Sequence, residues 1–504
     1  MSRFYITTAI PYANSVPHIG FAMEAIQTDC LARYHRLIGD DTYFLTGTDE
    51  HGMKIADTAE EKGKTPQEHV DEMVALNKDL KGILNLSYDD FIRTTSDRHK
   101  SGAQALWKKL VEAGDIYKDT YEGFYCSGCE AYVTEKDLVD GNCPTHKKPA
   151  VKFSEENYFF KLSKYSDKVK ELIESDTLKI VPEFRKREFL NIVKDGLTDV
   201  SFSRPKDALT WGIPVPDDSS QTMYVWCDAL SNYITALDYE NNGELFEKYW
   251  PADVHVIGKD ITRFHAGIWI GMLLSAGLEI PKSIYIHGFI TSGGHKMSKS
   301  IGNVVSPSEV ADKYGIDALR YYLLREIPTV DDGDFTYERF EELYNGELAN
   351  NLGNLVNRVL AMTDRYFEGK VPQVNENDDE LIARVGKFWE TYHSHMNNFN
   401  LKKAVEEIMF RADDANQYIE ENKPWALAKE DEKKLADVLY HLLEMLRHIG
   451  YALYPFMPDV SEKILDALSC KPLVEDASTV EKWGVLKEGD AITKCDQLFP
   501  RLED

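Results

Sequence analysis

The first part of the chain alternates short apolar runs with longer helical patterns. Residues 3–10 alternate β-branched and aromatic side chains, which predicts a strand that ends at Pro11. A helical pattern begins near His18, and an apolar run over 42–46 that stops at Gly47 predicts a second strand. Because strand, helix, strand is the signature of a parallel sheet with covered faces, we expect an α/β fold with a doubly wound, Rossmann-like sheet.

The pattern then changes twice. Near Tyr117 it gives way to a segment rich in Lys, Asp, Gly and Cys, which predicts a module inserted into the sheet domain. Apolar strands at 254–258 and 283–286, with a helix over 262–278 between them, indicate that the α/β pattern resumes. From about Tyr337 helical periodicity dominates, so we expect an all-α helix bundle in the last part of the chain.

Composition and charge narrow the class of protein. The 504 residues are enough for two to four domains, and 43% hydrophobic with 28% charged residues is ordinary globular composition. A formal net charge of -27 argues against a general nucleic-acid coat protein, which is usually basic. A local basic stripe at 185–187 or 296–299 could still contact phosphates, although the first fits solvated surface charge equally well.

We expect neither a targeting segment nor a membrane span. The longest uncharged stretch, from Phe264 to Leu278, is shorter than the ~20 residues that a span needs, so it predicts a buried helix. Seven cysteines are an odd number, which fits a reducing compartment, and we expect a cytoplasmic protein.

Pro17-His18-Ile19-Gly20 lies at the junction of the first predicted strand and helix. Such a junction directs backbone N–H groups and the positive helix end at an anion, and a glycine there lets a nucleotide approach closely. The His18 imidazole could then hydrogen-bond a phosphate oxygen; the alternative is a turn with a solvent-facing histidine. Neither the usual phosphate-loop motif nor the dinucleotide-binding glycine motif occurs in the chain.

A second segment, Lys296-Met297-Ser298-Lys299-Ser300, is flanked by glycines on both sides. Two ammonium groups on such a loop can close over a polyphosphate and neutralise the leaving group, whereas the pentapeptide alone would predict only an exposed polar loop. Together the two segments resemble the HIGH and KMSKS signatures of class I aminoacyl-tRNA synthetases. The first match is partial, because Phe21 stands where that family usually has a second histidine.

The segment after Tyr117 contains two short metal-binding spacings. Cys126-x2-Cys129 is followed by Cys143-x2-His146. Thiolate and imidazole ligands in two knuckles suit tetrahedral zinc, and a closed Cys3His set implies a structural role. A redox-active cysteine pair is the competing interpretation, but it leaves the second knuckle unexplained.

The resemblance narrows to the methionyl-tRNA synthetase family because of four further segments, residues 10–14, 47–52, 225–230 and 258–265. This resemblance extends over essentially the whole chain. The resemblance implies that Asp49 holds the ammonium group of methionine. It also implies a side-chain pocket lined by Ile10, Tyr12, Trp226, Ala229, Tyr233, Ile261 and His265. Aromatic rings pack well against a thioether, and Tyr or His can donate a weak hydrogen bond to sulfur, although Tyr233 taken singly suggests core packing.

Three residues of the helical part complete the resemblance. Asn354 and Arg358 are four apart and therefore share a helix face, and Trp425 follows Pro424 at a predicted helix boundary. In the resembled family these positions recognise the anticodon, and stacking and hydrogen bonding to single-stranded bases suit these side chains. Without the family, a surface Asn/Arg pair and a partly buried Trp would be expected.

The resemblance implies a two-step reaction. Methionine is activated with Mg-ATP to methionyl-adenylate and pyrophosphate, and methionine is then transferred to the 3′-terminal adenosine of tRNA(Met). We expect His18, Gly20 and Lys299 to bind ATP, and His18, Lys296 and Lys299 to be catalytic through charge stabilisation. The expected cofactor is one structural zinc per chain, and we expect a monomer.

Two other functions stay open. A class I synthetase for Ile, Val or Leu shares the expected architecture, but those enzymes carry a large editing domain where this insert is small and zinc-bearing. A catalytically inactive tRNA-binding relative is supported only by Phe21. The expected units are the two halves of a catalytic domain (1–116 and 225–290), the zinc insert (117–224), a lysine-loop and stem-contact region (291–345) and a helical anticodon-binding domain (346–504).

Overall fold

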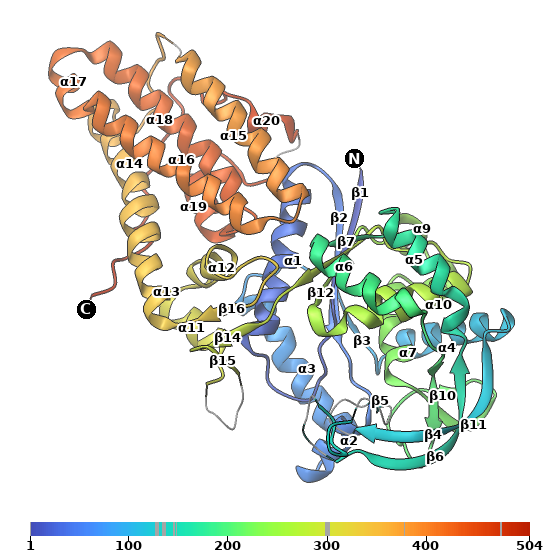
Figure 1. Cartoon of the computed structure of the whole chain (residues 1–504). Coiled ribbons are helices and arrows are strands. Elements are labelled where there is room, and N and C mark those ends of the chain that lie inside the picture. The colour runs from blue at the N-terminus through green and yellow to red at the C-terminus, as the bar shows by residue number, and fades with distance from the viewer. Residues whose placement is uncertain are drawn as a thin grey trace.

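The computed structural model describes residues 2–126, 131–133, 138–144, 147, 149–297, 303–376, 378–473 and 476–503. Its centre is a six-stranded sheet in which all neighbouring strands run parallel (Figure 1). The strand order is β3 (Asp90–Arg93), β2 (Asp41–Thr48), β1 (Arg3–Thr8), β12 (Val254–Gly258), β13 (Ser283–His287) and β7 (Lys179–Val181). The four strands predicted from the sequence all belong to this sheet, so the α/β prediction is confirmed.

Helices cover both faces of the sheet. Neighbouring residues of a strand point to opposite faces, and Tyr5 and Ile6 belong to two different buried clusters. The cluster of Ile6 includes α1 (Ile19–Leu37), and the cluster of Tyr5 includes α4 (Asp97–Glu112) and α10 (Ile270–Ser275). The remaining helices near the sheet are α2 (Met53–Glu61), α3 (Pro66–Ile83), α5 (Ser166–Glu174), α6 (Glu183–Ile192), α7 (Val225–Leu230), α8 (Asn232–Thr235) and α9 (Glu244–Tyr249).

The insert folds into antiparallel strands but also contributes to the main sheet. Its four-stranded sheet has the order β5 (Ala131–Val133), β4 (Ile116–Cys126), β6 (Val151–Phe160) and β8 (Val200–Ser201), beside a small sheet of β9 (Ser203–Pro205), β10 (Pro214–Val215) and β11 (Asp218–Met223). Strand β7 also comes from within the insert, and Lys179 to Val181 pair with Ser283 to Tyr285 of β13. A strand of three residues is too short to give a hydrophobic period, so the sequence did not predict it.

The helix predicted over 262–278 is present from Thr262 to Ser275, but its middle is not an α-helix. Residues Phe264–Trp269 form a π-helix (η6), which a 3-10 turn (η5, Lys259–Ile261) precedes along the chain and α10 follows. The His265 side chain lies 3.1 Å from the carbonyl oxygen of Ile261, the acceptor four residues back that a regular helix would use. A side chain that takes this carbonyl competes with the backbone ladder, and such bulges are frequent at functional sites.

The C-terminal part is helical, as predicted, and extends away from the sheet (Figure 1). A lysine-loop hairpin, β14 (Ile290–Ser292) and β15 (His295–Lys296), pairs with β16 (Gly333–Phe335) and leads through α11 (Pro307–Tyr314) and α12 (Ile316–Arg325) to the helices. These are α13 (Tyr337–Leu343), a π-helix (η7, Tyr344–Gly353), α14 (Asn354–Phe367), α15 (Asp379–Asn397), α16 (Leu401–Asn422), α17 (Pro424–Glu430), α18 (Glu432–Leu453), α19 (Pro458–Ala467) and α20 (Ser478–Glu481). Among the described residues, no helix combines the length and apolarity that crossing a bilayer requires.

A buried arginine joins the sheet domain to the helices. Arg320 of α12 pairs with Asp29 of α1 at 2.8 Å and donates to the carbonyl oxygens of Leu84, Pro455 and Phe456. Both Arg320 and Asp29 are fully buried, and removing one partner of such a pair leaves a costly unpaired charge. The two parts of the molecule are therefore held in one orientation by α1 and α12.

Candidate active site

Loops that carry the predicted site residues leave the same edge of the sheet. They follow the carboxyl ends of β1, β2 and β12. The strand order reverses between β1 and β12, and doubly wound sheets bind ligands outside the carboxyl ends of the strands at such a switch point. The predicted ATP and methionine residues on these loops thus lie where this fold binds ligands.

His18 is the N-cap of α1. Its Nδ1 accepts a hydrogen bond from Gly20 N at 3.1 Å, so in the neutral ring the proton is on Nε2. Desolvation lowers the pKa of His18 although the ring stays accessible to solvent, so the neutral form dominates at pH 7. The start of α1 therefore offers an imidazole N–H donor together with the positive end of the helix.

The segments before and after the lysine loop flank the start of α1. Ile19 N donates to the carbonyl oxygen of Val305 at 3.2 Å, and a Cβ atom at Gly20 would lie 3.4 Å from Ile290 Cγ2. Ile290 begins β14, which pairs with the β15 strand that contains Lys296. The structure therefore places the β14–β15 hairpin, which contains Lys296, beside the start of α1, while Lys299 lies outside the described residues.

The loop after β2 is held against the loop after β1. Asp49 N donates to Pro11 O at 2.9 Å, and Ala13 N donates to Asp49 O at 2.8 Å. These bonds place Tyr12 and Asp49 side by side. Asp49 is 5% exposed, and a carboxylate so shielded from water suits an ammonium ligand.

Aromatic side chains of three short helices form a second wall. Trp226 of α7 stacks on Phe264 of η6, with ring centroids 3.7 Å apart and ring planes at 6°; Phe264 was not predicted from the sequence. Tyr233 of α8 and His265 of η6 are buried, with Tyr233 Oη 2.7 Å from His265 Nε2. The predicted pocket residues that belong to or border this wall are Ile10, Trp226, Ala229, Tyr233, Ile261 and His265.

The proton positions in this wall follow from its partners. The carbonyl oxygen of Ile261 can only accept, so His265 Nδ1 carries a proton and Nε2 accepts from the Tyr233 hydroxyl. Burial lowers the pKa of His265 to about 4, so the ring is neutral at pH 7. In this arrangement the Tyr233 hydroxyl and the His265 ring have both used their protons, and a weak hydrogen bond from Tyr or His to sulfur stays a prediction.

Three buried residues behind the pocket were not predicted as site residues. Asp228 Oδ2 accepts from His51 Nδ1 at 2.6 Å, and Asp228 Oδ1 accepts from His99 Nε2 at 2.7 Å. Burial opposes ionisation of Asp228, but the two imidazoles outweigh it and lower its pKa to about 2. His51 and Asp228 occur in segments 47–52 and 225–230, so their motifs were visible, whereas His99 gave no signal.

A second polar pair lies near the end of β1. Glu24 of α1 accepts from Ala9 N at 2.9 Å and lies 2.8 Å from His287 Nε2. Burial raises the pKa of Glu24. For His287 burial acts in the opposite direction, but the Glu24 carboxylate outweighs it and raises the pKa of the ring. The pair therefore retains a shared proton at this edge of the sheet.

The predicted anticodon residues lie together on the helical domain. Asn354 is exposed on the first turn of α14, and Arg358 follows one turn later on the same face. Arg358 lies 6.0 Å from the ring of Trp425, which is 43% exposed, and pairs with Glu420 at 2.6 Å. A cation and an exposed indole side by side suit an unstacked base.

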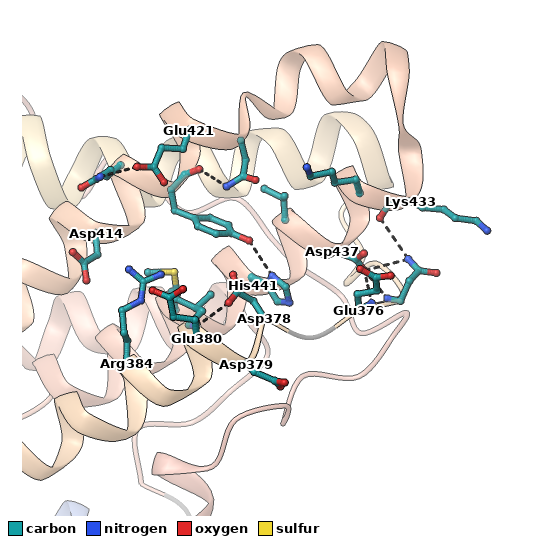
Figure 2. Close-up of a pocket in the computed structure, with 18 of the residues that line it drawn as sticks. Glu376, Asp378, Asp379, Glu380, Arg384, Asp414, Glu421, Lys433, Asp437 and His441 are labelled. Carbon is teal, nitrogen blue, oxygen red and sulfur yellow. Dashed lines mark hydrogen bonds between the residues drawn. The ribbon is translucent and has the colours of Figure 1, made fainter.

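A cavity of about 900 Å³ lies elsewhere in the helical domain, between α15, α16 and α18 (Figure 2). None of the predicted anticodon residues lines it. Acidic side chains dominate its wall, namely Glu376, Asp378, Asp379, Glu380, Asp414, Glu421, Asp431 and Asp437. An acidic wall of this kind disfavours phosphates, and the cavity is separate from the predicted anticodon residues.

The predicted zinc ligands are only partly described. Cys129 and His146 lie outside the described residues, and no metal-binding cluster occurs among the residues that the structure describes. Cys126 and Cys143 are the buried side chains among the described positions from 117 to 150, and neither belongs to a hydrophobic cluster. Their role as zinc ligands therefore stays a prediction.

Comparison with known proteins decides the family. Residues 4–152 and 145–360 match the family model for class I tRNA synthetases (M), and residues 370–504 match the anticodon binding domain of methionyl tRNA ligase. The chain belongs to the methionyl-tRNA synthetase family. A methionine–tRNA ligase of Caldanaerobacter subterraneus subsp. tengcongensis is 46% identical over 99% of this chain and 79% of its own length. One of Clostridium perfringens is 48% identical over 99% of this chain and 78% of its own length.

Solved structures of the family agree in fold. Mycobacterium tuberculosis methionyl-tRNA synthetase in complex with methionyl-adenylate has a TM-score of 0.95 and 39% identity, covering 99% of this chain and 100% of that chain. The apo form of the same synthetase has a TM-score of 0.87 and 37% identity, covering 100% and 99%. The fold described above is thus more similar to the adenylate complex than to the free synthetase.

Proposed function

We propose that this chain is a methionine–tRNA ligase, which forms methionyl-adenylate from methionine and ATP and then charges tRNA(Met). The observation that carries the proposal is the start of α1, where the His18 cap lies between the two segments that bound the lysine loop. Asp49 and the aromatic wall lie at the same edge of the sheet. Membership of the methionyl-tRNA synthetase family and similarity to a relative bound to methionyl-adenylate support it.

In the first step the methionine carboxylate attacks the α-phosphorus of ATP in line, and Mg-pyrophosphate leaves. Negative charge builds on the phosphate oxygens, so charge stabilisation and positioning supply most of the catalysis. We assign the Nε2–H of His18 and the N-terminus of α1, with Gly20, to the phosphates. Lys296 and Lys299 neutralise the departing pyrophosphate, and Mg-ATP is a substrate.

The amino-acid end of the site is assigned to the two loops and the wall. Asp49 binds the ammonium group of methionine, and Tyr12 beside it lines the side-chain pocket. Ile10, Trp226, Ala229, Tyr233, Ile261 and His265 surround the thioether. In the second step the 3′-terminal adenosine of tRNA takes the methionyl group and AMP leaves.

Methionine-dependent ATP–pyrophosphate exchange, run against a panel of amino acids, tests the function. We expect exchange with methionine and not with isoleucine, valine, leucine or cysteine, which excludes a synthetase for another amino acid. Lys299→Ala should slow exchange about 10²-fold with little change in methionine affinity, whereas Lys494→Ala on the helical side should have no effect. No exchange with any amino acid would support the inactive relative, and unchanged exchange in Lys299→Ala would remove its proposed role.

We propose one structural zinc in the insert, held by Cys126, Cys129, Cys143 and His146. A closed set of four ligands leaves no position for substrate, so the ion would stabilise the fold of the insert and take no part in the chemistry. Elemental analysis should find one zinc per chain, and Cys126→Ser should lose it. Cys470→Ser, outside the insert, should keep the ion; retention of zinc in Cys126→Ser would contradict the assignment.

We also propose a reducing compartment, the cytoplasm, and a monomer. None of the described cysteines forms a disulfide, which supports the first part. Sedimentation at micromolar concentration tests the second.

A further inference from the structure

Asp228 lies behind the proposed methionine pocket and hydrogen-bonds to two histidines, His51 and His99, in segments next to it. It belongs to α7, between Trp226 and Ala229, which are three apart and share the pocket face of the helix. Asp228 lies on a different face, where its carboxylate is fully buried. Its position therefore suggests a support rather than a contact with substrate.

One carboxylate oxygen of Asp228 reaches the loop after β2. It accepts from His51 Nδ1 at 2.6 Å, and His51 is two residues beyond Asp49. The same loop is held from its other side, because Trp211 Nε1 donates to Glu50 O at 2.5 Å and the Trp211 ring meets the His51 ring edge-on. Asp228 thus fixes the distance between α7 and the loop that carries the ammonium-binding carboxylate.

The other oxygen of Asp228 reaches α4 and, through it, α8. It accepts from His99 Nε2 at 2.7 Å, and in the neutral ring His99 Nδ1 then accepts from the Thr235 hydroxyl at 2.9 Å. Thr235 is in α8, two residues beyond Tyr233, and a Cβ atom at Gly102 of α4 would lie only 2.6 Å from Thr235 Cγ2. Helices α4 and α8 are therefore in direct contact, and this close packing prevents the hydrogen-bonded side chains from shifting relative to one another.

We infer that Asp228 is a positioning residue for methionine: its two oxygens hold the Asp49 loop, Trp226 on α7 and Tyr233 on α8 in one geometry. The inference rests on the proposed methionine pocket. Charge-assisted hydrogen bonds of this kind are short and directional. A shift of the Asp49 loop relative to the aromatic wall by a fraction of an ångström would therefore weaken the fit of the methionine ammonium group and side chain together.

The test is steady-state exchange with Asp228→Asn, with separate determination of the methionine KM, the ATP KM and kcat. An amide can accept from only one of the two imidazoles, so we expect the methionine KM to rise on the order of tenfold while the ATP KM stays within about twofold. Asp29→Asn is the matched control, because Asp29 is an equally buried carboxylate that pairs with Arg33 and Arg320 away from the pocket. It should lower the melting temperature without selective loss of methionine affinity.

If Asp228→Asn does not fold, His99→Gln gives the same test from the α4 side, with methionine binding followed by tryptophan fluorescence. A methionine KM that stays at the wild-type value, or that rises no more than the ATP KM, would overturn the inference. Asp49→Asn separates this result from a failure of the pocket itself. If Asp49→Asn and Asp228→Asn both leave methionine binding unchanged, the proposed pocket itself is wrong. If Asp49→Asn weakens methionine binding and Asp228→Asn does not, the pocket is supported and the inference about Asp228 is wrong.

Discussion

His18 Nδ1 accepts the hydrogen bond of Gly20 N at 3.1 Å, and the His18 ring lies directly against Gly20. The side chain therefore has two separate uses. Nδ1 caps α1, and Nε2 is the donor that we assign to phosphate. Because different atoms serve the two uses, substitutions at this position can separate helix stability from catalysis.

Asparagine is a good N-cap but is too short to reach the place of the imidazole Nε2. We expect His18→Asn to keep the melting temperature of the wild type and to lose about 10²-fold in exchange rate. His18→Ala should lose the same activity and also about 1 kcal/mol of stability with the cap. Wild-type exchange in His18→Asn would show that the imidazole does not serve the phosphates.

Gly20→Ala should damage activity without damaging the fold. The added Cβ would lie 2.9 Å from His18 Cε1, so the ring has to move, whereas alanine favours helix over glycine by about 1 kcal/mol. We expect kcat/KM for ATP to fall between about tenfold and a hundredfold. Gly82→Ala in α3, where nothing lies within 4 Å of the new Cβ, is the control; equal activity of the two variants would contradict the prediction.

Phe21→His tests the departure from the family signature. Phe21 lies three residues after His18, one turn along α1, and packs partly buried against the core. A second imidazole there should raise the rate of adenylate formation several-fold, because it adds a donor near the phosphates. Phe21→Leu, which only changes packing, should not. A rate that does not rise in Phe21→His would indicate that another donor already occupies this role.

Arg358→Ala should affect tRNA and leave activation intact. Arg358 lies beside the exposed Trp425 on the helical domain, far along the chain from the adenylate site. We expect the KM for tRNA(Met) in aminoacylation to rise at least about tenfold, with unchanged methionine-dependent exchange. Arg365→Ala, an exposed arginine of the same helix, is the control. Equal effects of the two substitutions would indicate only loss of general charge.

Asp317 predicts a pH dependence of stability in the region between the sheet domain and α19. Burial raises its pKa to about 7, although it accepts a hydrogen bond from Val460 N at 2.7 Å. A raised pKa means that folding favours the protonated form, so this contribution to stability is present at low pH and is lost as the pH rises through about 7. Between pH 6 and 8 the loss should be about 1 kcal/mol. In Asp317→Asn the free energy of unfolding should lack this component, and parallel pH profiles of the two proteins would contradict the prediction.

The sequence was sufficient wherever a signal is local. The main strands, the junction at His18 and the pocket segments follow from periodicity and short motifs, and the structure places them at one edge of the sheet. It was insufficient where partners are distant in the chain. Asp228 meets His99 only because α4 folds behind α7, and His99 stands in an ordinary helical segment with no motif around it.

Helix α1 shows a second limit. Its apolar residues predicted one buried face, but Glu24, Asp29 and Arg33 at the margins of that face are buried as well. The reason is that α1 lies between the sheet and the helical domain and is covered from both sides (Figure 1). Polar residues are read as exposed by any pattern argument, and only the partners in the fold, such as His287 and Arg320, show that they are satisfied inside.

The pairing of β7 with β13 has a consequence for engineering of this enzyme. Deletion of residues 117–224 would remove β7, the strand that pairs with β13. Strand β13 would then be an edge strand with unpaired backbone N–H and C=O groups. Exposed edge strands of this kind pair with strands of other chains, which leads to aggregation. A miniaturised variant therefore has to retain Lys179–Val181, or supply a substitute strand, whatever becomes of the zinc knuckles.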